Sequence, residues 1–257
     1  MKIIGTLDAV SILIVIMFFF VRINMPPAMR LLAPRKGRLP TKAFVINLPE
    51  RKDRLQHFKT QPTVLQDRLQ VIEATKGKAV DIENTPYLSP QAKEILRNVV
   101  ETGKRTNHSD LTPNAVGCYL SHVECWRECL KQNHASCVVF EDDARLSKSF
   151  DRHLRYMLTM APSDYDILLM GGFYHDFSFG LFTNRIKRFM CTHAYVITAD
   201  AISKLLKEGG KGLPIEEQLD FQLSRLSTAG DLKIYAGFHR PALQGTFSSD
   251  VQTHGLR

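Results

Sequence analysis

The sequence is short of several features that mark familiar classes of protein. It has only 5 cysteines in 257 residues, an odd number that does not suggest a disulfide framework. It contains neither the glycine-rich dinucleotide fingerprint nor the phosphate-loop signature, no internal repeat and no low-complexity tract. No basic run is interleaved with aromatic residues. These absences argue against a disulfide-stapled domain, a repeat protein and a nucleic-acid-binding protein.

The cysteines are also poorly spaced for a zinc site, which needs close pairs and a fourth ligand. Cys118, Cys125 and Cys129 recur at i, i+7 and i+11, a spacing that favours reduced thiols on the apolar face of one helix. Cys137 and Cys191 lie in apolar, strand-like runs. We therefore expect the cysteines to be packing residues. The net charge of +8 favours anionic partners, either phosphate-bearing ligands or membrane surfaces.

A strongly apolar segment, Ile3–Val21, opens the chain. A membrane-spanning helix needs about 20 apolar residues, which this segment reaches if Asp8 is tolerated near one end. No small-x-small cleavage site follows it. Residues 1–23 are thus predicted to be a signal-anchor transmembrane helix, and residues 24–40, with four prolines, a stem. The basic residues after the segment favour a cytoplasmic main domain, but a lumenal type II orientation in the Golgi or ER remains open.

Residues 41–257 alternate predicted strands and helices. We expect strands at 42–48, 69–74, 137–140, 165–170, 190–198 and 232–236. We expect helices from Pro49, over 89–100, from Thr112 to 132, over 151–160, over 201–208 with Asp200 as the cap, and from Pro214 to about 226. The polar residues 75–110 are a weakly patterned insertion without an evident chemical role. The alternation indicates one α/β domain with a mainly parallel sheet and helices on both faces.

Three acidic residues, Glu141-Asp142-Asp143, directly follow the buried strand predicted at 137–140. Ligands of α/β folds bind beyond the carboxyl ends of strands. Side-chain alternation places Glu141 and Asp143 on one side and Asp142 on the other. Hard oxygen ligands of this kind suit Mg²⁺ or Mn²⁺ carrying a diphosphate. By itself the triplet is better explained as an acidic turn that caps the next helix, and only the rest of the chain reverses that preference.

Six short motifs follow one another between Phe44 and about Val251. They are Val45–Arg54 (INL-x-x-R-x-x-R), Leu111–Pro113 with Gly117–His122 (GC-x-x-SH), Val139–Asp143 (LEDD), Thr192–Ile197 (G-x-x-AY-x-I), Leu213–Asp220, and Ser249–Val251 (SD-I). In this order they resemble glycosyltransferase family 25, the lipopolysaccharide-biosynthesis and collagen-galactosyltransferase group. The chain departs from the family at Asn114–Val116, where an acidic residue is common, and in the stretched motif that ends at Asp220.

The resemblance implies a GT-A fold, a Rossmann-like α/β domain that uses a nucleotide-sugar donor and a divalent metal. Asp143 and Glu141 would then hold Mn²⁺ or Mg²⁺, which neutralises the leaving diphosphate. Glu141 or Asp142 would orient hydroxyl groups of the ribose or the donor sugar. Galactose is the family's commonest donor sugar, so UDP-galactose is the expected donor by analogy. The acceptor would be a glycan, a lipid-linked saccharide or a protein hydroxyl.

Further donor-binding residues follow from the same resemblance. Arg51 and Arg54 lie just past the first strand, where fork-like hydrogen bonds to the base or phosphates compete with a role as solvated helix charges. His122 matches a motif and either lines the donor site or is a satisfied core residue. The late histidines His239 and His254 lie where some GT-A enzymes supply a metal-binding histidine, and spacing selects neither. The remaining donor-site candidates are Asn47, Leu48, Ser121 and Asp250.

Inverting sugar transfer requires a carboxylate that deprotonates the acceptor hydroxyl. Asp220 is the leading candidate, and Glu217 lies one turn earlier on the same face of the predicted helix. Both residues are also consistent with solvated helical charges. Two alternative functions remain: a glycoside hydrolase with paired carboxylates and no metal, and an inactive membrane-anchored module that binds a sugar nucleotide.

Overall fold

The computed structural model describes residues 38–174, 183–207, 209–237, 240–245 and 255–256. Within these ranges no helix has the length and apolar character needed to cross a membrane. The predicted signal anchor at 1–23 lies outside the described residues, as do most of the stem, His239, Asp250 and His254. Predictions about these segments therefore stay predictions.

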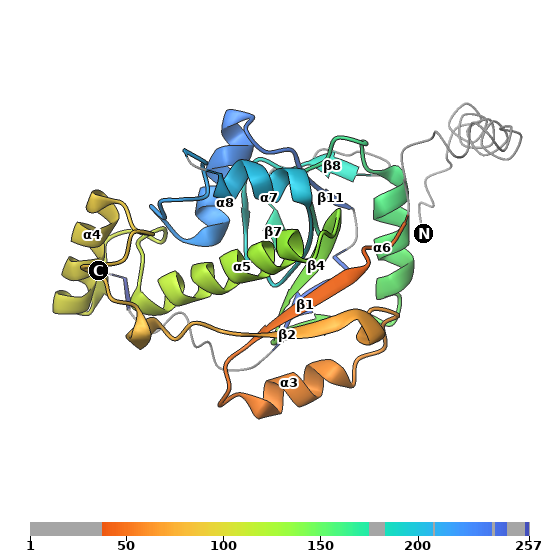
Figure 1. Ribbon diagram of the computed structural model, residues 1–257, viewed down its shortest axis with the longest axis horizontal. Coiled ribbons are helices and arrows are strands. Elements are labelled where there is room, and N and C mark those ends of the chain that lie inside the picture. The colour runs from red at the N-terminus through yellow and green to blue at the C-terminus, as the bar shows by residue number, and fades with distance from the viewer. Residues whose placement is uncertain (1–37, 175–182, 208, 238–239, 246–254, 257) are drawn as a thin grey trace, which may run out of the picture. The chain divides into compact units, whose positions relative to one another are not determined.

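A seven-stranded sheet forms the centre of the described region, in the order β2-β1-β4-β10-β6-β11-β8 (Figure 1). Its strands are β1 (Lys42–Asn47), β2 (Leu69–Glu73), β4 (Ser136–Glu141), β6 (Ile167–Leu169), β8 (Thr183–Arg185), β10 (Ala194–Thr198) and β11 (Ile234–Gly237). The shorter strands are β3 (Lys104–Arg105), β5 (Ala144–Leu146), β7 (Phe173–Tyr174), β9 (Phe189–Met190), β12 (Ala242–Gln244) and β13 (Gly255–Leu256).

The sheet is mainly parallel, as predicted, because β2, β1, β4, β6 and β11 run in one direction, but β10 and β8 run in the other. β2, β1 and β4 run parallel, as do β6 and β11. β10 is antiparallel to both of its neighbours, β4 and β6, and β8 is antiparallel to β11. Ala194–Ile197 of β10 are fully buried, which produces the continuous apolar run that is typical of a parallel strand. Such a run shows burial on both faces but does not reveal strand direction.

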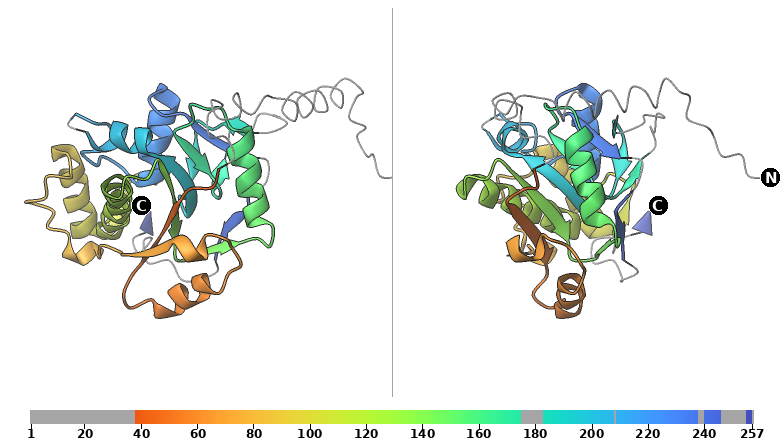
Figure 2. Two further views of the ribbon diagram at one scale, coloured as in Figure 1. Left: turned by 45° about the vertical axis from the view of Figure 1, so that its right-hand side comes forward. Right: turned by 90° about the vertical axis from the view of Figure 1, so that its right-hand side faces the viewer.

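Helices cover both faces of the sheet, as predicted. On one face lie α5 (Pro113–Lys131), α7 (Ala199–Leu206) and α8 (Leu219–Ala229), with α4 (Pro90–Thr102) beyond them; on the other lie α3 (Lys52–Lys59) and α6 (Phe150–Met160) (Figures 1 and 2). The alternation of β1 explains this arrangement. Phe44 and Ile46 join the core under α5, while Ala43 and Val45 join the core under α3 and α6.

The starts of three helices test the sequence signals. Thr112 caps α5 as predicted, because its hydroxyl accepts a hydrogen bond from the amide of Ala115 at 3.0 Å. Helix α7 is instead capped by Thr198, which accepts from Ala201 at 3.1 Å, and Asp200 lies in its first turn. Helix α8 begins at Leu219 and not at Pro214.

The residues before α8 are held by contacts that are distant in sequence. The amide of Ile215 donates to the carbonyl of Tyr87 at 2.6 Å, and the carbonyl of Ile215 accepts from Ser89 at 3.2 Å. Gln222 of α8 accepts a hydrogen bond from the amide of Glu216 at 3.1 Å. Because these bonds occupy the backbone groups of Ile215 and Glu216 outside a helix, Pro214 does not open one.

Candidate active site

A cavity of about 440 Å³ opens at the carboxyl ends of β1, β2 and β4, a size within the usual range for small-ligand sites. Its lining combines the ends of these strands with the first half of α5, the loop after β2, the residues between β9 and β10, and the start of α8. Glu141, Asp142, Asp143 and Asp220 all line it. The acidic triplet thus lies in a cavity and does not face bulk solvent.

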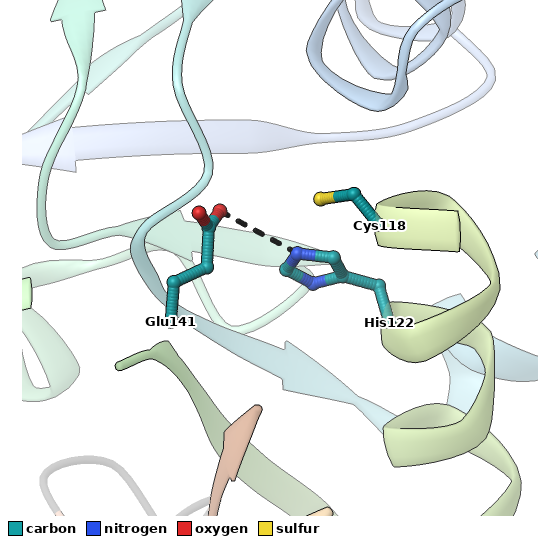
Figure 3. Close-up of side chains that lie close together, drawn as sticks. All are labelled: Cys118, His122 and Glu141. Atoms are coloured by element: carbon teal, nitrogen blue, oxygen red, sulfur yellow. Dashed lines mark ion pairs between the residues drawn. The ribbon is translucent and has the colours of Figure 1, made fainter. Parts of the chain in front are cut away.

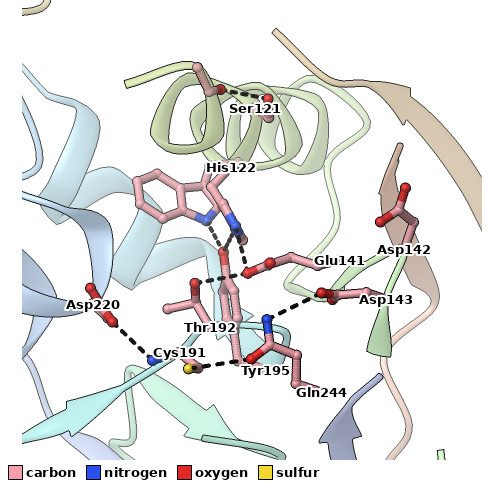
Figure 4. Close-up of polar contacts among 12 residues, drawn as sticks. Ser121, His122, Glu141, Asp142, Asp143, Cys191, Thr192, Tyr195, Asp220 and Gln244 are labelled. Atoms are coloured by element: carbon pink, nitrogen blue, oxygen red, sulfur yellow. Dashed lines mark hydrogen bonds and ion pairs between the residues drawn. The ribbon is translucent and has the colours of Figure 1, made fainter. Parts of the chain in front are cut away.

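Asp142 is held by buried partners from the first strand and helix. One carboxylate oxygen accepts from Asn47 Nδ2 at 2.6 Å, and the other accepts from Arg54 Nη1 at 3.1 Å. Burial raises the pKa of Asp142, and the hydrogen bonds from Asn47 and Arg54 oppose that rise. Asp142 therefore fastens the tip of β4 to β1 and α3. Figure 4 shows it directed away from Glu141 and Asp143.

Glu141 and Asp143 have different hydrogen-bond partners (Figure 4). Thr192 Oγ1 donates to Glu141 Oε1 at 3.1 Å. Gln244 Nε2 donates to one oxygen of Asp143 at 3.2 Å, while the buried Oδ1 of Asp143 has no hydrogen-bond partner among the described residues. A buried oxygen without a partner is costly, and a bound ion is one arrangement that would satisfy it.

The electrostatics of this pair also fit a divalent cation. Burial raises the pKa of Asp143 to about 7, and the nearby charge of Glu141 adds to the rise. Burial likewise opposes ionisation of Glu141, but the contact with His122 and the hydrogen bond from Thr192 hold the pKa of Glu141 below its usual value. Neighbouring carboxylates disfavour each other's charge, and a divalent cation would remove that penalty. The oxygen donors of Asp143 and Glu141 match the preference of Mn²⁺ and Mg²⁺.

His122 lies behind Glu141, fully buried, and takes part in a hydrogen-bonded chain. Its Nδ1 lies 2.8 Å from the hydroxyl of Tyr195, and Trp126 Nε1 donates to the same hydroxyl at 2.9 Å. Burial raises the pKa of Tyr195, so the hydroxyl keeps its proton and donates it to Nδ1. His122 then carries its hydrogen on Nε2, which lies 3.5 Å from Glu141 Oε1. We conclude that His122 positions Glu141 and does not itself line the cavity.

Cys118 adds a donor that the sequence reasoning missed (Figure 3). It lies one turn before His122 on α5, and the ligand atoms of Cys118, His122 and Glu141 all fall within 4.8 Å of one another. The i, i+4 spacing that places Cys118 and His122 on one face of the helix is visible in the sequence. The prediction that Cys118 is a packing residue came instead from its i, i+7 and i+11 spacing with the next two cysteines. Burial raises the pKa of the Cys118 thiol well above its usual value, so the hard oxygen pair Glu141–Asp143 is the better match for a hard cation.

Asp220 lies in the first turn of α8 and is held by backbone amides. Its two oxygens accept from Cys191 N at 2.9 Å and Phe221 N at 3.0 Å. Cys191 interrupts the strand predicted over 190–198 and has a left-handed φ of 70°. Burial raises the pKa of Asp220, and these amide hydrogen bonds oppose the rise. Backbone geometry at Cys191 therefore joins Asp220 to the segment that carries Thr192.

Glu217 does not lie beside Asp220 on a helix, so that prediction is wrong. It precedes the N-cap residue Gln218, and its carboxylate accepts from Arg225 Nε at 2.7 Å. Among the described residues it does not line the cavity, whereas Gln218, Leu219 and Asp220 do. The non-helical segment before α8 is the reason for this placement.

A comparison with models of known protein families finds a match for this sequence. The chain matches glycosyltransferase family 25 (LPS biosynthesis protein) over residues 40–179. The chain belongs to this family. The matched range contains the acidic tip, His122 and the loop after β2, whereas Asp220 lies beyond it.

Curated relatives share about half of this chain. Procollagen galactosyltransferase 1-A of Xenopus laevis is 32% identical over 50% of this chain and 20% of its own length, and procollagen galactosyltransferase 2 of Mus musculus is 31% identical over the same shares. A Bos taurus protein named probable inactive glycosyltransferase 25 family member 3 is 28% identical over 50% of this chain and 21% of its own length. The match thus spans about a fifth of these relatives.

Among solved structures, the crystal structure of A197 from STIV shares 12% identity and superposes with a TM-score of 0.41, over 82% of this chain and 96% of that one. A likeness at this level carries no argument about function.

The other predicted donor residues of this family 25 domain divide into two groups. Leu48, Arg54 and Ser121 line the cavity, but Ser121 also accepts from Thr75 N at 2.8 Å and donates to Gly117 O at 2.7 Å. Asn47 binds Asp142, and the guanidinium of Arg51 contacts Asp53 at 3.3 Å near the start of α3. Among the described residues, neither Asn47 nor Arg51 lines the cavity.

The loop after β2 is part of the site, although its sequence gave no chemical signal. Thr75, Lys76, Gly77 and Lys78 all line the cavity. A Cβ at Gly77 would fall within 2.5 Å of backbone atoms of Pro113 and Asn114, and a Cβ at Gly117 would overlap the carbonyl oxygen of Thr75. Only glycine at these two positions lets the loop pack directly against α5.

Proposed function

We propose that this family 25 protein is a metal-dependent inverting glycosyltransferase that moves a sugar, galactose by analogy, from a UDP-sugar to a hydroxyl acceptor. The supporting observation is the buried oxygen of Asp143, beside Glu141 in the cavity, that has no hydrogen-bond partner in the described part of the chain. In this proposal Asp143 and Glu141 hold Mn²⁺ or Mg²⁺. When bound, the ion neutralises charge on the departing diphosphate.

The residues of the chain supply the rest of the reaction. Asp220 accepts the proton of the acceptor hydroxyl, whose oxygen forms a bond to the anomeric carbon of the sugar. The bond from that carbon to the diphosphate oxygen breaks, and UDP leaves with the electron pair. Two amide hydrogen bonds fix the orientation of Asp220, and its raised pKa brings its basicity closer to the range that is useful near neutral pH.

Sugar transfer is favoured over the alternatives by the chemistry of the cavity. A hydrolase with paired carboxylates needs no cation, whereas the oxygen of Asp143 that lacks a partner among the described residues is suited to one. An inactive binding module is consistent with the relatives that are named inactive, but the acidic tip of this chain is intact and lines the cavity. Activity therefore has to be tested together with nucleotide binding.

The test uses the purified full chain with a panel of UDP-sugars and hydroxyl acceptors, with Mn²⁺ or with EDTA. We expect sugar transfer in Mn²⁺, its loss in EDTA, and a rise in Tm when UDP and Mn²⁺ are added together, because ligands of the native state raise apparent stability. A rise in Tm without transfer would support the inactive module. Sugar release that persists in EDTA and needs no nucleotide would overturn the proposal in favour of a hydrolase.

Membrane attachment is a separate part of the proposal. We propose that residues 1–23 anchor the protein as a single transmembrane helix, because Ile3–Val21 is almost continuously apolar. Protease digestion of sealed microsomes would give the orientation: protection of residues 41–257 indicates a lumenal domain, and digestion a cytoplasmic one. Extraction of the full chain from membranes by carbonate would contradict the anchor.

A further inference from the structure

The charged residues that line the cavity gather in two places, one rich in carboxylates and one, the loop after β2, that carries two lysines with Glu50 beside them. The acidic side is formed by the tip of β4 and by Asp220. The cations that line the cavity in the described part of the chain are Arg54, Lys76 and Lys78. Arg54 is bound to Asp142 at 3.1 Å, and Lys76 pairs with Glu50 at 2.9 Å. Lys78 is exposed and makes no hydrogen bond or ion pair within the described residues, so its charge is available to a ligand.

Lys78 is carried by a loop with a fixed conformation. The amide of Thr75 donates to Ser121 of α5 at 2.8 Å. Gly77 is buried against the start of α5, and the carbonyls of Lys76 and Gly77 accept from Ala79 at 2.9 Å and Val80 at 3.1 Å. A fixed loop loses little conformational freedom when a ligand binds, which favours its use as a binding element.

The surroundings of Lys78 suit an anion. Asn114 and Ala115, in the first turn of α5, line the same cavity, and the N-terminal end of a helix favours negative charge. An anion alone would be repelled by the carboxylates on the acidic side. A ligand that carries both phosphates and a bound cation matches both sides, because the cation meets the carboxylates and the phosphates meet the lysines.

We infer that Lys78, with Lys76 beside it, binds the diphosphate of the sugar-nucleotide donor. The inference rests on the proposed function and extends it by naming the loop that recognises the phosphates. It replaces the predicted phosphate contact of Arg51 and Arg54, whose guanidinium groups lie against Asp53 and Asp142. Lys78 supplies the free charge, and Lys76 lies at a position where it can exchange Glu50 for a phosphate oxygen.

The experiment compares the binding of UDP and uridine to the full chain in Mn²⁺ by calorimetry. Lys78→Ala should weaken UDP binding by about 5- to 10-fold, as expected for loss of one partly exposed charge-assisted contact, and leave uridine binding unchanged. Lys78→Arg should retain most of the affinity for UDP. Lys187→Ala is the matched control, since Lys187 is exposed and does not line the cavity; it should bind UDP as the wild type does.

The outcomes separate this inference from the proposed function. If the wild type transfers sugar but Lys78→Ala binds UDP normally, or loses UDP and uridine equally, the inference is wrong and the function stands. If the wild type transfers no sugar and binds no UDP, inorganic pyrophosphate with Mn²⁺ becomes the probe. Pyrophosphate binding that weakens in Lys78→Ala would then support the phosphate-binding loop alone, and absence of binding would overturn both.

Discussion

The two sides of the cavity hold their carboxylates by different means. On the side built from β1, α3 and β4, Asp142 is bound by the buried side chains of Asn47 and Arg54. On the side built from the β9–β10 segment and α8, Asp220 is bound by backbone amides of Cys191 and Phe221. In the first arrangement, side chains that shape the site also belong to the core. In the second, backbone amides hold Asp220, so its side chain can be changed with little effect on the fold. Substitutions on the two sides should therefore have different consequences.

The largest effect should come from Asp143→Asn. Asp143 belongs to the first side, but one of its oxygens has no partner among the described residues, so the variant should fold. Loss of the ionised oxygen should reduce kcat/KM by about 1000-fold, or about 4 kcal/mol of transition-state stabilisation. Steady-state kinetics in saturating Mn²⁺ measure the effect. Activity within a few-fold of the wild type would remove Asp143 from the site.

The same variant tests the electrostatics of the pair. The pKa of Asp143 is raised to about 7 in the folded protein, so between about pH 4 and pH 7 the native state holds a proton that the unfolded state has lost. This group therefore lowers stability as pH rises through that window, by about 1.4 kcal/mol per pH unit at most. Urea denaturation without metal should show that the fall becomes smaller in Asp143→Asn. An unchanged pH profile would contradict the raised pKa.

The next largest effect should be on stability, in Arg54→Met. Removing one partner of a buried ion pair leaves the other charge unpaired, which costs about 3 kcal/mol or more. The free energy of unfolding from urea titration should fall accordingly. Arg68→Met is a suitable control, because Arg68 is more exposed and donates to the backbone carbonyl of Pro40 at 3.0 Å. If both variants lose the same free energy of unfolding, the buried ion pair of Arg54 with Asp142 stabilises the fold no more than the exposed contact of Arg68 does.

Asp220→Asn, on the other side of the cavity, should reduce catalysis much more than it reduces stability. We expect kcat to fall by about 100-fold, in keeping with the usual contribution of a general base. The donor KM should stay nearly constant, and stability should change by about 1 kcal/mol because one amide hydrogen bond is lost. Kinetics and thermal unfolding on one preparation would show the split. A large loss of stability would remove the contrast between the two sides.

The smallest effect should come from Glu217→Gln. Glu217 pairs with Arg225 on a partly exposed surface, an interaction worth about 0.5 kcal/mol or less. Transfer activity should remain within about two-fold of the wild type. A collapse of activity comparable with that of Asp220→Asn would mean that Glu217 and not Asp220 is the base.

A different contrast, between local signals and distant contacts, explains how much could be predicted from sequence. Several features follow from local signals: Thr112 caps α5, the strand before Glu141 is buried, and the alternation at Glu141–Asp142 sends the two side chains in opposite directions. These signals depend on residue type and on neighbours within a few positions, so they can be recognised from the sequence alone.

Other features depend on contacts between distant segments, such as those of Asn47 and Arg54 with Asp142. Ile215 pairs with Tyr87 across the fold, and this contact prevents the helix that Pro214 suggested. The break at Cys191 is a backbone feature that residue type does not announce, since a left-handed φ is uncommon for cysteine. Gln244 reaches Asp143 from more than 100 residues away. Position in the fold, and not composition, gives these residues their roles.

The packing of the loop against α5 and the charge of the loop depend on different residues: Gly77 and Gly117 allow the packing, and the lysines provide the charge. A methyl group at either glycine would push the loop away from α5, whereas the side chains of Lys76 and Lys78 can be exchanged without disturbing that contact. Mutation can therefore alter the charge that the loop offers while the spacing between loop and helix is inherited unchanged. Ligand preference and scaffold shape can evolve independently at neighbouring positions of one short segment.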